Sequence, residues 1–360
     1  MTSAKDSASK PAQGALHDAT DYPEVHPGRA GQNQSHPQTI VFLHGGNVGN
    51  WSWDPQVLAF GDFNVLTLHL PAFGARFEET WEGLESAADD VAALIADEVS
   101  EGGVHLVGIS LGGVIALHVA ARHPELVDSV LITGTPVTGA STAARTFHRM
   151  QLKLIGSEWY WRFQAGAYGM VDDERELFAE HGVKLKAENM RAIMNDLDPG
   201  GLPKNLGAYR GPVLALVGSK EPKLVQKSFI ALREELPQAI TRVVPGMHHQ
   251  WNIENPILFN SVLRRWITDG GLHQILLDPQ ATKPARNTKS TPAEQAAEVP
   301  VNQSQETGES TPPLQEDGQK KLGRFTGKSN PRKLDSKKFD LKKKGPQRGD
   351  TPEDAADTGK

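Results

Sequence analysis

Short apolar segments alternate with longer amphipathic segments through the middle of the chain, between about residues 38 and 278. The short segments are rich in β-branched residues and bounded by turn residues, which is typical of buried strands. The longer segments carry apolar side chains at helical spacing. Strands that alternate with helices pair in parallel, because a parallel connection needs a crossover. The pattern therefore predicts an α/β fold, a mostly parallel sheet with helices on both faces.

The boundaries of these elements follow from the same pattern. Strands are predicted at residues 39–43, 64–70, 103–108, 129–133, 212–217 and 240–244. Helices are predicted at residues 81–99, 111–122, 223–236 and 256–266. A helical insertion rich in aromatic residues separates two of the strands, at about residues 136–209. The short region before residue 38 leaves little room for further edge strands, so we expect a sheet of about six strands.

The two ends of the chain differ in composition from this α/β domain at residues 38–278. Residues 1–37 are small and polar, and a Pro/Ser/Thr/Glu/Gln-rich linker begins at Pro279, so we expect both segments, 1–37 and 279–360, to be disordered. Between Lys320 and Arg348 the chain has a local charge of +10, while the remainder carries −16. This basic tail is either a solvated end or a contact to an anionic surface or polymer.

The composition also excludes several classes of protein. The chain has no cysteine, so disulfide frameworks, thiolate metal sites and cysteine nucleophiles are excluded. Its apolar runs are too short for a membrane span, and residues 1–14 lack the apolar core of a signal peptide. No phosphate loop, dinucleotide fingerprint or metal-ligand cluster is present, so we expect no cofactor and no metal. We predict a cytoplasmic protein, and its oligomeric state stays open.

One turn between a predicted strand and a predicted helix contains the pattern G-x-S-x-G, in the sequence VHLVGISLGG at 104–113. A serine on so tight a turn is lifted above the end of the sheet, and Gly108 and Gly112 leave room for the turn. The helix that follows directs its first N–H groups toward developing negative charge. Ser110 is therefore a candidate nucleophile, the alternative being a glycine-rich turn with an incidental serine.

The first predicted strand ends in a second glycine turn, L-H-G-G at 43–46. Such a turn lets a backbone N–H face the space above Ser110. We expect the N–H groups of Gly46 and Leu111 to form an oxyanion hole, although the glycines alone fit a tight turn equally well. His44, at the end of the strand, is interpreted as a structural residue that binds backbone around the loop.

Two later strands end in residues that can assist a nucleophilic serine. Strand 212–217 runs into Glu221, and strand 240–244 runs into His248 and His249. The carboxyl ends of parallel strands share one edge of the sheet, where ligands bind. A serine needs a base to accept its proton, and the base needs a carboxylate to orient it.

These four segments, H-G-G, G-I-S-L-G-G, V-G-S-K-E-P and P-G-M-H-H followed by E-N-P, match the α/β-hydrolase family in order and spacing. Residues 38–270 resemble its capped branch, which includes esterases, C–C bond hydrolases and lyases. The resemblance implies Ser110 as nucleophile, Glu221 as acid and His249 as base, with oxyanion donors from Gly46 and Leu111. Family members place this histidine five residues before a glutamate, and Glu254 selects His249 over His248.

Two segments depart from the family pattern. The acid is usually aspartate, and Glu221 is one methylene longer. The segment after the second strand usually reads D-x-P-G-x-G-x-S, but here it is H-L-P-A-F-G-A-R at 69–76. That loop shapes a wall of the site, so analogy does not identify the substrate.

The resemblance makes the insertion at 136–209 a cap over Ser110, and aromatic residues then become candidates for the substrate pocket. These are Trp51, Trp159, Trp161 and Trp251, the alternative being that such residues pack the cap onto the main domain. We predict a serine hydrolase that cleaves a small carboxylic ester or related acyl substrate through an acyl-enzyme on Ser110. Two alternatives remain: C–C bond hydrolysis or lyase chemistry with the same residues, and a non-catalytic hydrolase-like binding protein.

Overall fold

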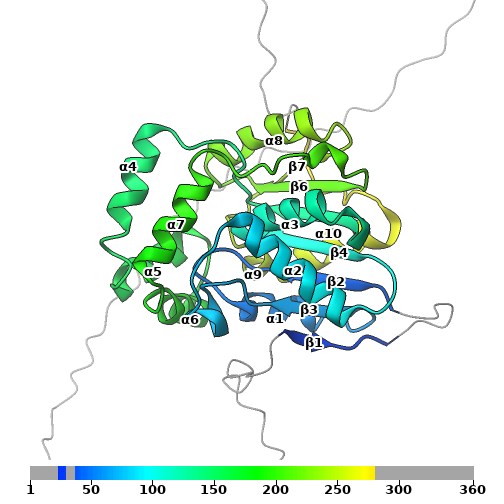
Figure 1. The fold of residues 1–360 in the computed structure, drawn as a ribbon, viewed down its shortest axis with the longest axis horizontal. Coiled ribbons are helices and arrows are strands. Elements are labelled where there is room, and N and C mark those ends of the chain that lie inside the picture. Colours follow the sequence, from blue (N-terminus) through cyan, green and yellow to red (C-terminus); the bar gives the residue numbers. More distant parts are fainter. Residues whose placement is uncertain (1–22, 30–36, 280–360) are drawn as a thin grey trace, which may run out of the picture. The chain divides into compact units, whose positions relative to one another are not determined.

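The computed structural model describes residues 23–29 and 37–279 (Figure 1). The disorder predicted for the remaining residues, and the basic tail at 320–348, lie outside the described residues. Among the described residues no helix combines the length and the apolar character that a membrane span requires.

The centre of the structure is a seven-stranded sheet in the order β1-β3-β2-β4-β5-β6-β7. Six neighbouring strands are parallel, which confirms the predicted α/β class. The strands are β1 (Glu24–His26), β2 (Thr39–Leu43), β3 (Asn64–Leu68), β4 (Val104–Ile109), β5 (Val127–Thr133), β6 (Val213–Gly218) and β7 (Ile240–Val244).

The antiparallel edge strand β1 corrects two expectations, a sheet of about six strands and disorder throughout residues 1–37. It pairs Glu24 with Thr67 and His26 with Val65 of β3. Just beyond it, the N–H of Gly28 donates to the side chain of Asn64 at 2.9 Å. Backbone hydrogen bonds thus hold a three-residue strand whose one apolar side chain, Val25, is exposed. So short a segment has no hydrophobic period, and the sequence pattern did not reveal it.

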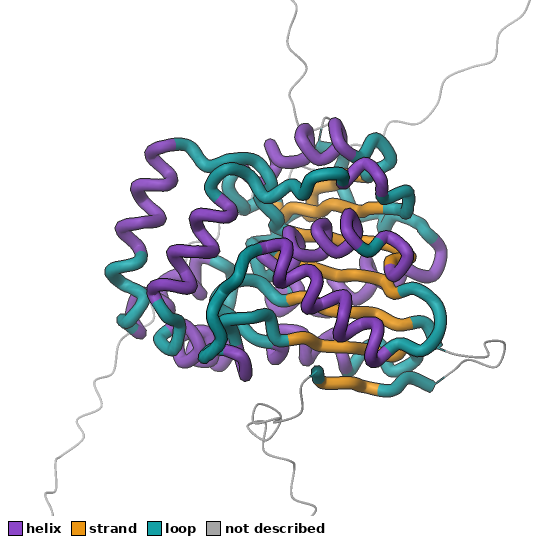
Figure 2. The backbone as a smooth tube through the Cα atoms, viewed as in Figure 1, coloured by secondary structure: helices purple, strands orange, loops and turns teal. Residues whose placement is uncertain are grey.

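Alternate side chains of the parallel strands pack on opposite faces of the sheet. On β2, Val41 joins one buried cluster, while Ile40 and Phe42 join the other. Because both faces are covered, β2 and β6 are buried along their whole length rather than at alternate residues. Helices flank the sheet on both sides (Figure 2), as the sequence predicted.

The first buried cluster includes residues of α2, α3 and α8, and the second includes residues of α10. The helices of the main domain are α1 (Asp54–Val57), α2 (Leu84–Glu98), α3 (Leu111–Arg122), α8 (Lys223–Glu235), α9 (Trp251–Glu254) and α10 (Pro256–Asp269). Short 3₁₀ helices occur at η2 (Asn50–Trp53), η3 (Gly74–Arg76), η4 (Pro124–Leu126) and η5 (Leu206–Ala208). Helix α3 is buried over ten of its twelve residues, which explains why its sequence is apolar all round.

The insertion between β5 and β6 consists of helices, which lie together beside one end of the sheet (Figure 1). They are α4 (Thr142–Gln151), α5 (Glu158–Ala167), α6 (Asp172–Gly182) and α7 (Ala187–Leu197). We call residues 136–209 the cap. Cap residues share a cavity with residues that follow β2, β4, β5, β6 and β7, so the cap faces the carboxyl ends of the strands.

Candidate active site

Ser110 lies at the turn between β4 and α3, as the G-x-S-x-G pattern predicts. Its backbone has φ 54° and ψ −117°, a conformation that costs about 1–3 kcal/mol in a residue with a side chain. Neighbouring structure holds this turn: the N–H of Ser110 donates to Thr133, and its carbonyl accepts from Gly113 and Val114. The strain is thus imposed by the sheet and the helix together, which hold Ser110 at the wall of a cavity.

The two glycines of the pattern are required by close backbone contacts. A Cβ atom at Gly108 would lie 2.5 Å from the carbonyl oxygen of Gly112. A Cβ atom at Gly112 would overlap the carbonyl oxygen of Leu43, at the end of β2. The start of α3 can therefore approach both strands only because these positions lack a side chain.

Glu221 and His249 form a hydrogen-bonded pair between the loops after β6 and β7. His249 Nδ1 lies 2.6 Å from Glu221 Oε2, and the N–H of Gly218 donates to Glu221 Oε1 at 2.8 Å. The glutamate side chain is only 1% exposed, so its carboxylate depends on these donors. A carboxylate only accepts hydrogen bonds, so the His249 proton lies on Nδ1 and leaves Nε2 as an acceptor.

Gly134, directly after β5, provides the space for this pair and escaped the sequence analysis. Its φ of 59° favours glycine, and a Cβ atom there would lie 2.7 Å from His249 Nδ1 and 3.0 Å from Glu221 Oε2. A glycine after a strand is a common turn signal, so the sequence alone did not distinguish this one.

The neighbouring histidines have other partners. His248 Nδ1 lies 2.8 Å from Glu254 Oε1, and the N–H of His248 donates to the other oxygen of that carboxylate. His44 Nε2 accepts from the N–H of Leu70 at 3.1 Å, so its proton lies on Nδ1 and is donated to the carbonyl of Gly45. Burial lowers the pKa of His44 to about 3. His44 is therefore a neutral structural residue, as the sequence predicted.

Gly46 and Leu111 line the cavity together with Ser110. Leu111 is the first residue of α3, and N–H groups in the first turn of a helix have no partner within it. Both predicted oxyanion donors thus border the same space as the serine.

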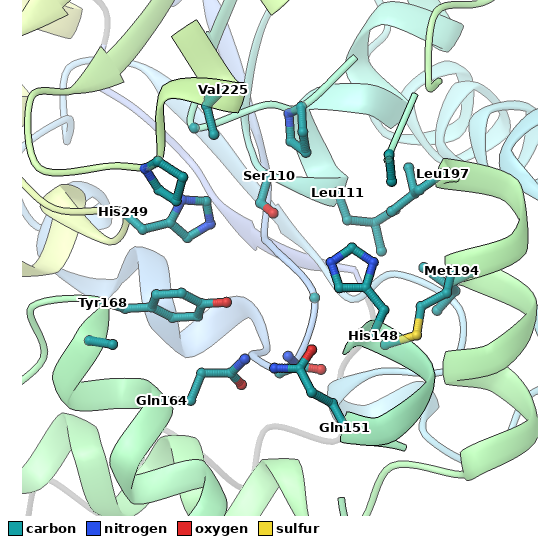
Figure 3. A pocket seen from close by; sticks show the side chains of 18 of the residues that line it. Ser110, Leu111, His148, Gln151, Gln164, Tyr168, Met194, Leu197, Val225 and His249 are labelled. Carbon is teal, nitrogen blue, oxygen red and sulfur yellow. The ribbon is translucent and has the colours of Figure 1, made fainter. Parts of the chain in front are cut away.

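The cavity between the main domain and the cap has a volume of about 530 Å³, which is in the range of small-molecule sites. Ser110, Glu221 and His249 line it, and Figure 3 shows the hydroxyl of Ser110 and the ring of His249 on its wall. Phe73 also lines it, so the divergent loop at 69–76 contributes to a wall, as expected. Within the described part of the chain, Ser110 Oγ makes no hydrogen bond. Hydrogen bonds between catalytic groups are often long without substrate and shorten when substrate binds.

Three of the four predicted pocket tryptophans lie elsewhere. Trp251 is fully buried and donates through Nε1 to Thr133, whereas Trp51 packs against His181. Trp159 is 62% exposed. The pocket assignment of these residues is corrected: two of them pack inside the protein, and the third points to solvent. Trp161 does line the cavity, and its Nε1 donates to Ile155.

Tyr168, at the end of α5, is a pocket residue that the sequence analysis noted only as part of an aromatic cluster. Its ring lies against that of His249, with the centroids 4.8 Å apart. Burial, followed by the charges of Tyr160 and Glu221, raises the pKa of Tyr168 to about 12, so its hydroxyl stays protonated. Figure 3 shows this hydroxyl pointing into the cavity. The cluster of aromatic residues suggested that the cap lines the pocket. Helical spacing did not show which of these residues face the cavity.

No cluster of three or more potential metal ligands occurs among the described residues.

Comparisons with known proteins identify the family. The sequence model of the Alpha/beta hydrolase family matches residues 40–262, more than half of the chain. The chain therefore belongs to this family, and it is an enzyme rather than a non-catalytic binding protein.

Individual relatives differ in the reactions that their names give. A putative carbamate hydrolase of Pantoea ananatis is 26% identical over 68% of this chain and 93% of its own length. A 2-succinyl-6-hydroxy-2,4-cyclohexadiene-1-carboxylate synthase of Escherichia coli is 28% identical over 60% of this chain and 88% of its own length. A solved structure from a study of carboxylesterases of Nitrososphaera gargenis has the same fold, with a TM-score of 0.55 and 21% identity over 68% of this chain and 93% of that chain.

Proposed function

We propose that the protein is a serine hydrolase that cleaves a carboxylic ester or a related acyl compound. The observation that carries this proposal is the pair of Glu221 and His249, joined at 2.6 Å on the wall of the cavity that also contains Ser110. Glu221 fixes the tautomer of the imidazole, so that Nε2 is the atom able to accept the serine proton.

The reaction then proceeds in two halves. In the first half, Ser110 Oγ transfers its proton to His249 Nε2 and attacks the carbonyl carbon. The N–H groups of Gly46 and Leu111 bind the resulting oxyanion. The intermediate collapses as the imidazolium returns its proton to the leaving alcohol, which leaves the acyl group on Ser110.

In the second half, His249 takes a proton from water, and the hydroxide formed attacks the acyl carbon. The second oxyanion collapses, and the proton returns to Ser110 Oγ. The products are a carboxylic acid and the free enzyme. Glu221 stabilises the imidazolium formed in each half, and its burial strengthens that interaction.

The test is reaction of the purified protein with a fluorophosphonate probe, with the labelled peptide identified by mass spectrometry. We expect one label, on Ser110, together with hydrolysis of short acyl esters. Ser110→Ala should lose both, and His249→Ala should label at least a hundredfold more slowly. Absence of labelling in a folded wild-type protein would contradict the proposal.

The second candidate is C–C bond cleavage or lyase chemistry, which the name of the synthase relative favours. In that reaction His249 acts as the base for substrate, and Ser110 need not become acylated. Turnover without a covalent acyl-enzyme would favour this candidate.

A further inference from the structure

Tyr168, directly after α5, brings the cap into contact with the proposed base. Its ring centroid lies 4.8 Å from that of His249, and the two rings are tilted by 45°. Its backbone carbonyl accepts a hydrogen bond from the N–H of Gln250, the residue after His249, at 3.2 Å. Both the ring and the backbone of Tyr168 are therefore held against the loop that carries the base.

Gly169 allows the chain after α5 to approach this loop closely. Its φ of 89° favours glycine. A Cβ atom at this position would lie 3.0 Å from the Cβ of His248 and 3.0 Å from Oε2 of Glu254. The contact between the cap and the loop after β7 is thus formed without strain because this residue has no side chain.

The hydroxyl of Tyr168 points into the cavity (Figure 3). Among the described residues it has no hydrogen-bond partner. Burial, followed by the charges of Tyr160 and Glu221, raises the pKa of Tyr168 to about 12, so the hydroxyl keeps its proton at neutral pH. A protonated phenol on the wall of a ligand-sized cavity is available to donate a hydrogen bond to a bound ligand.

The position of this hydroxyl indicates which atom of the substrate it meets. The leaving oxygen takes its proton from His249, so it must lie within hydrogen-bond reach of that ring. Because the ring of Tyr168 lies against the imidazole, its hydroxyl is on the same side of the site. Figure 3 shows Leu111, a proposed oxyanion donor, on the side of Ser110 opposite His249. Tyr168 therefore faces the leaving group rather than the oxyanion.

We propose that Tyr168 is a further catalytic residue, whose hydroxyl donates a hydrogen bond to the leaving-group oxygen as the scissile C–O bond breaks. The electron pair of that bond passes to the oxygen, which takes the proton of the His249 imidazolium, while Tyr168 keeps its own proton. The hydrogen bond is strongest when the oxygen carries most negative charge, so it stabilises the transition state more than the bound substrate. This inference rests on the proposed function, because Ser110 and His249 define where the bond breaks.

The test compares three esters that share an acyl group and differ in the basicity of the leaving oxygen: nitrophenyl, phenyl and cyclohexyl butyrate. Tyr168→Phe keeps a ring against His249 and removes only the hydroxyl. This variant should lower kcat/KM about a hundredfold for the cyclohexyl ester. For the nitrophenyl ester the loss should be less than about fivefold, because nitrophenolate leaves with little assistance. The ratio kcat/KM reports formation of the acyl-enzyme, the half of the reaction in which the leaving group departs.

Two further variants separate the hydroxyl from the packing of the ring. Tyr168→Leu also removes the ring that holds His249, so all three esters should lose a further, equal factor relative to Tyr168→Phe. The matched control is Tyr160→Phe, which removes another hydroxyl from the cavity wall, one that lies 3.5 Å from Nε2 of Gln164. This control should change kcat/KM by the same factor for the three esters.

An equal loss for the three esters in Tyr168→Phe would overturn the inference, because a purely structural role does not depend on the leaving group. Wild-type hydrolysis with a label on Ser110 would then still support the proposed function, so the two failures are distinguishable. A folded wild type that hydrolyses none of the three esters would contradict both.

Discussion

The main domain and the cap differ in how each contributes to the cavity. The main domain supplies Ser110, Glu221 and His249 from loops that directly follow buried parallel strands. The cap supplies side chains from the faces of helices, including His148 and Trp161. Backbone pairing in the sheet determines where a strand ends, whereas only side-chain packing determines which face of a cap helix turns inward. In the proposed function, the reacting groups belong to the main domain, whose strand ends are set by backbone pairing, and the cap completes the cavity around them.

The largest expected effect separates two adjacent histidines of the main domain. His249→Ala should lower kcat/KM for a short ester by about 10⁴-fold, because His249 is the proposed base for the serine proton. His248→Ala should lower it by less than tenfold, since His248 is paired with Glu254 rather than with Glu221. Steady-state kinetics on both variants measures this, and equal losses would place the base elsewhere.

The carboxylate that orients the base gives the next largest effect. Glu221→Gln should lower kcat by about 10³-fold with little change in KM, because an amide can donate to Nδ1 and favour the wrong tautomer. Glu221→Asp should retain more activity, since it keeps the charge at a greater distance from His249. The kcat values of the two variants decide the matter. If Glu221→Gln is more active than Glu221→Asp, Glu221 does not orient His249.

In the cap, two tryptophans close in sequence should respond differently. Trp161→Ala removes a buried ring that lines the cavity, and it should lower the free energy of unfolding by about 3–5 kcal/mol. Trp159→Ala, at an exposed position, should change it by less than about 0.5 kcal/mol. Urea unfolding measures both, and a large effect of Trp159→Ala would show that the cap packs differently from this description.

The smallest effect concerns His44, the structural histidine that directly follows β2. His44 titrates near its ordinary pKa of 6.5 in the unfolded chain but at about 3 in the folded protein, mainly because of burial. The unfolded state binds more protons between these values, so stability should fall as pH falls from 6.5 toward 3. His44 alone should account for about 1.5 kcal/mol between pH 6.5 and pH 5.

Urea titrations of the wild type and His44→Gln at several pH values isolate this contribution. The variant should show a shallower fall of the unfolding free energy on acidification, whatever its stability at neutral pH. Burial, followed by the nearby charge of Arg76, lowers the pKa of His69 to about 4. His69 therefore still contributes to the pH dependence of stability in the variant. An unchanged slope in His44→Gln would mean that His44 is protonated in the folded protein.

The sequence predicted the parallel sheet and the residues at its edge because both follow from local patterns. A strand that ends in G-x-S-x-G, or in a carboxylate or histidine, places that residue at the edge of the sheet without further information. The sequence did not reveal β1, which pairs with β3 through its backbone and has no hydrophobic period, or the space that Gly134 provides for the pair of Glu221 and His249.

In the cap, composition was a poor guide to position. Aromatic residues suggested pocket contacts at Trp51, Trp159 and Trp251, but tertiary packing placed these side chains in the interior or in solvent. The cavity residues His148 and Gln151 escaped notice because polar side chains on a helix that buries no residue fully are usually solvated. A pattern that assumes apolar residues face inward does not select such residues.

The central claim is that the main domain forms a covalent intermediate on Ser110. Its most direct test is rapid acid quenching of the wild type during turnover of a nitrophenyl ester, followed by peptide mass spectrometry. We expect a mass increase equal to the acyl group on the peptide that contains Ser110, and no increase in Ser110→Ala. A burst of nitrophenol shows that an intermediate accumulates before the slower step. If such a burst occurs and no acylated Ser110 peptide is found, the claim is contradicted.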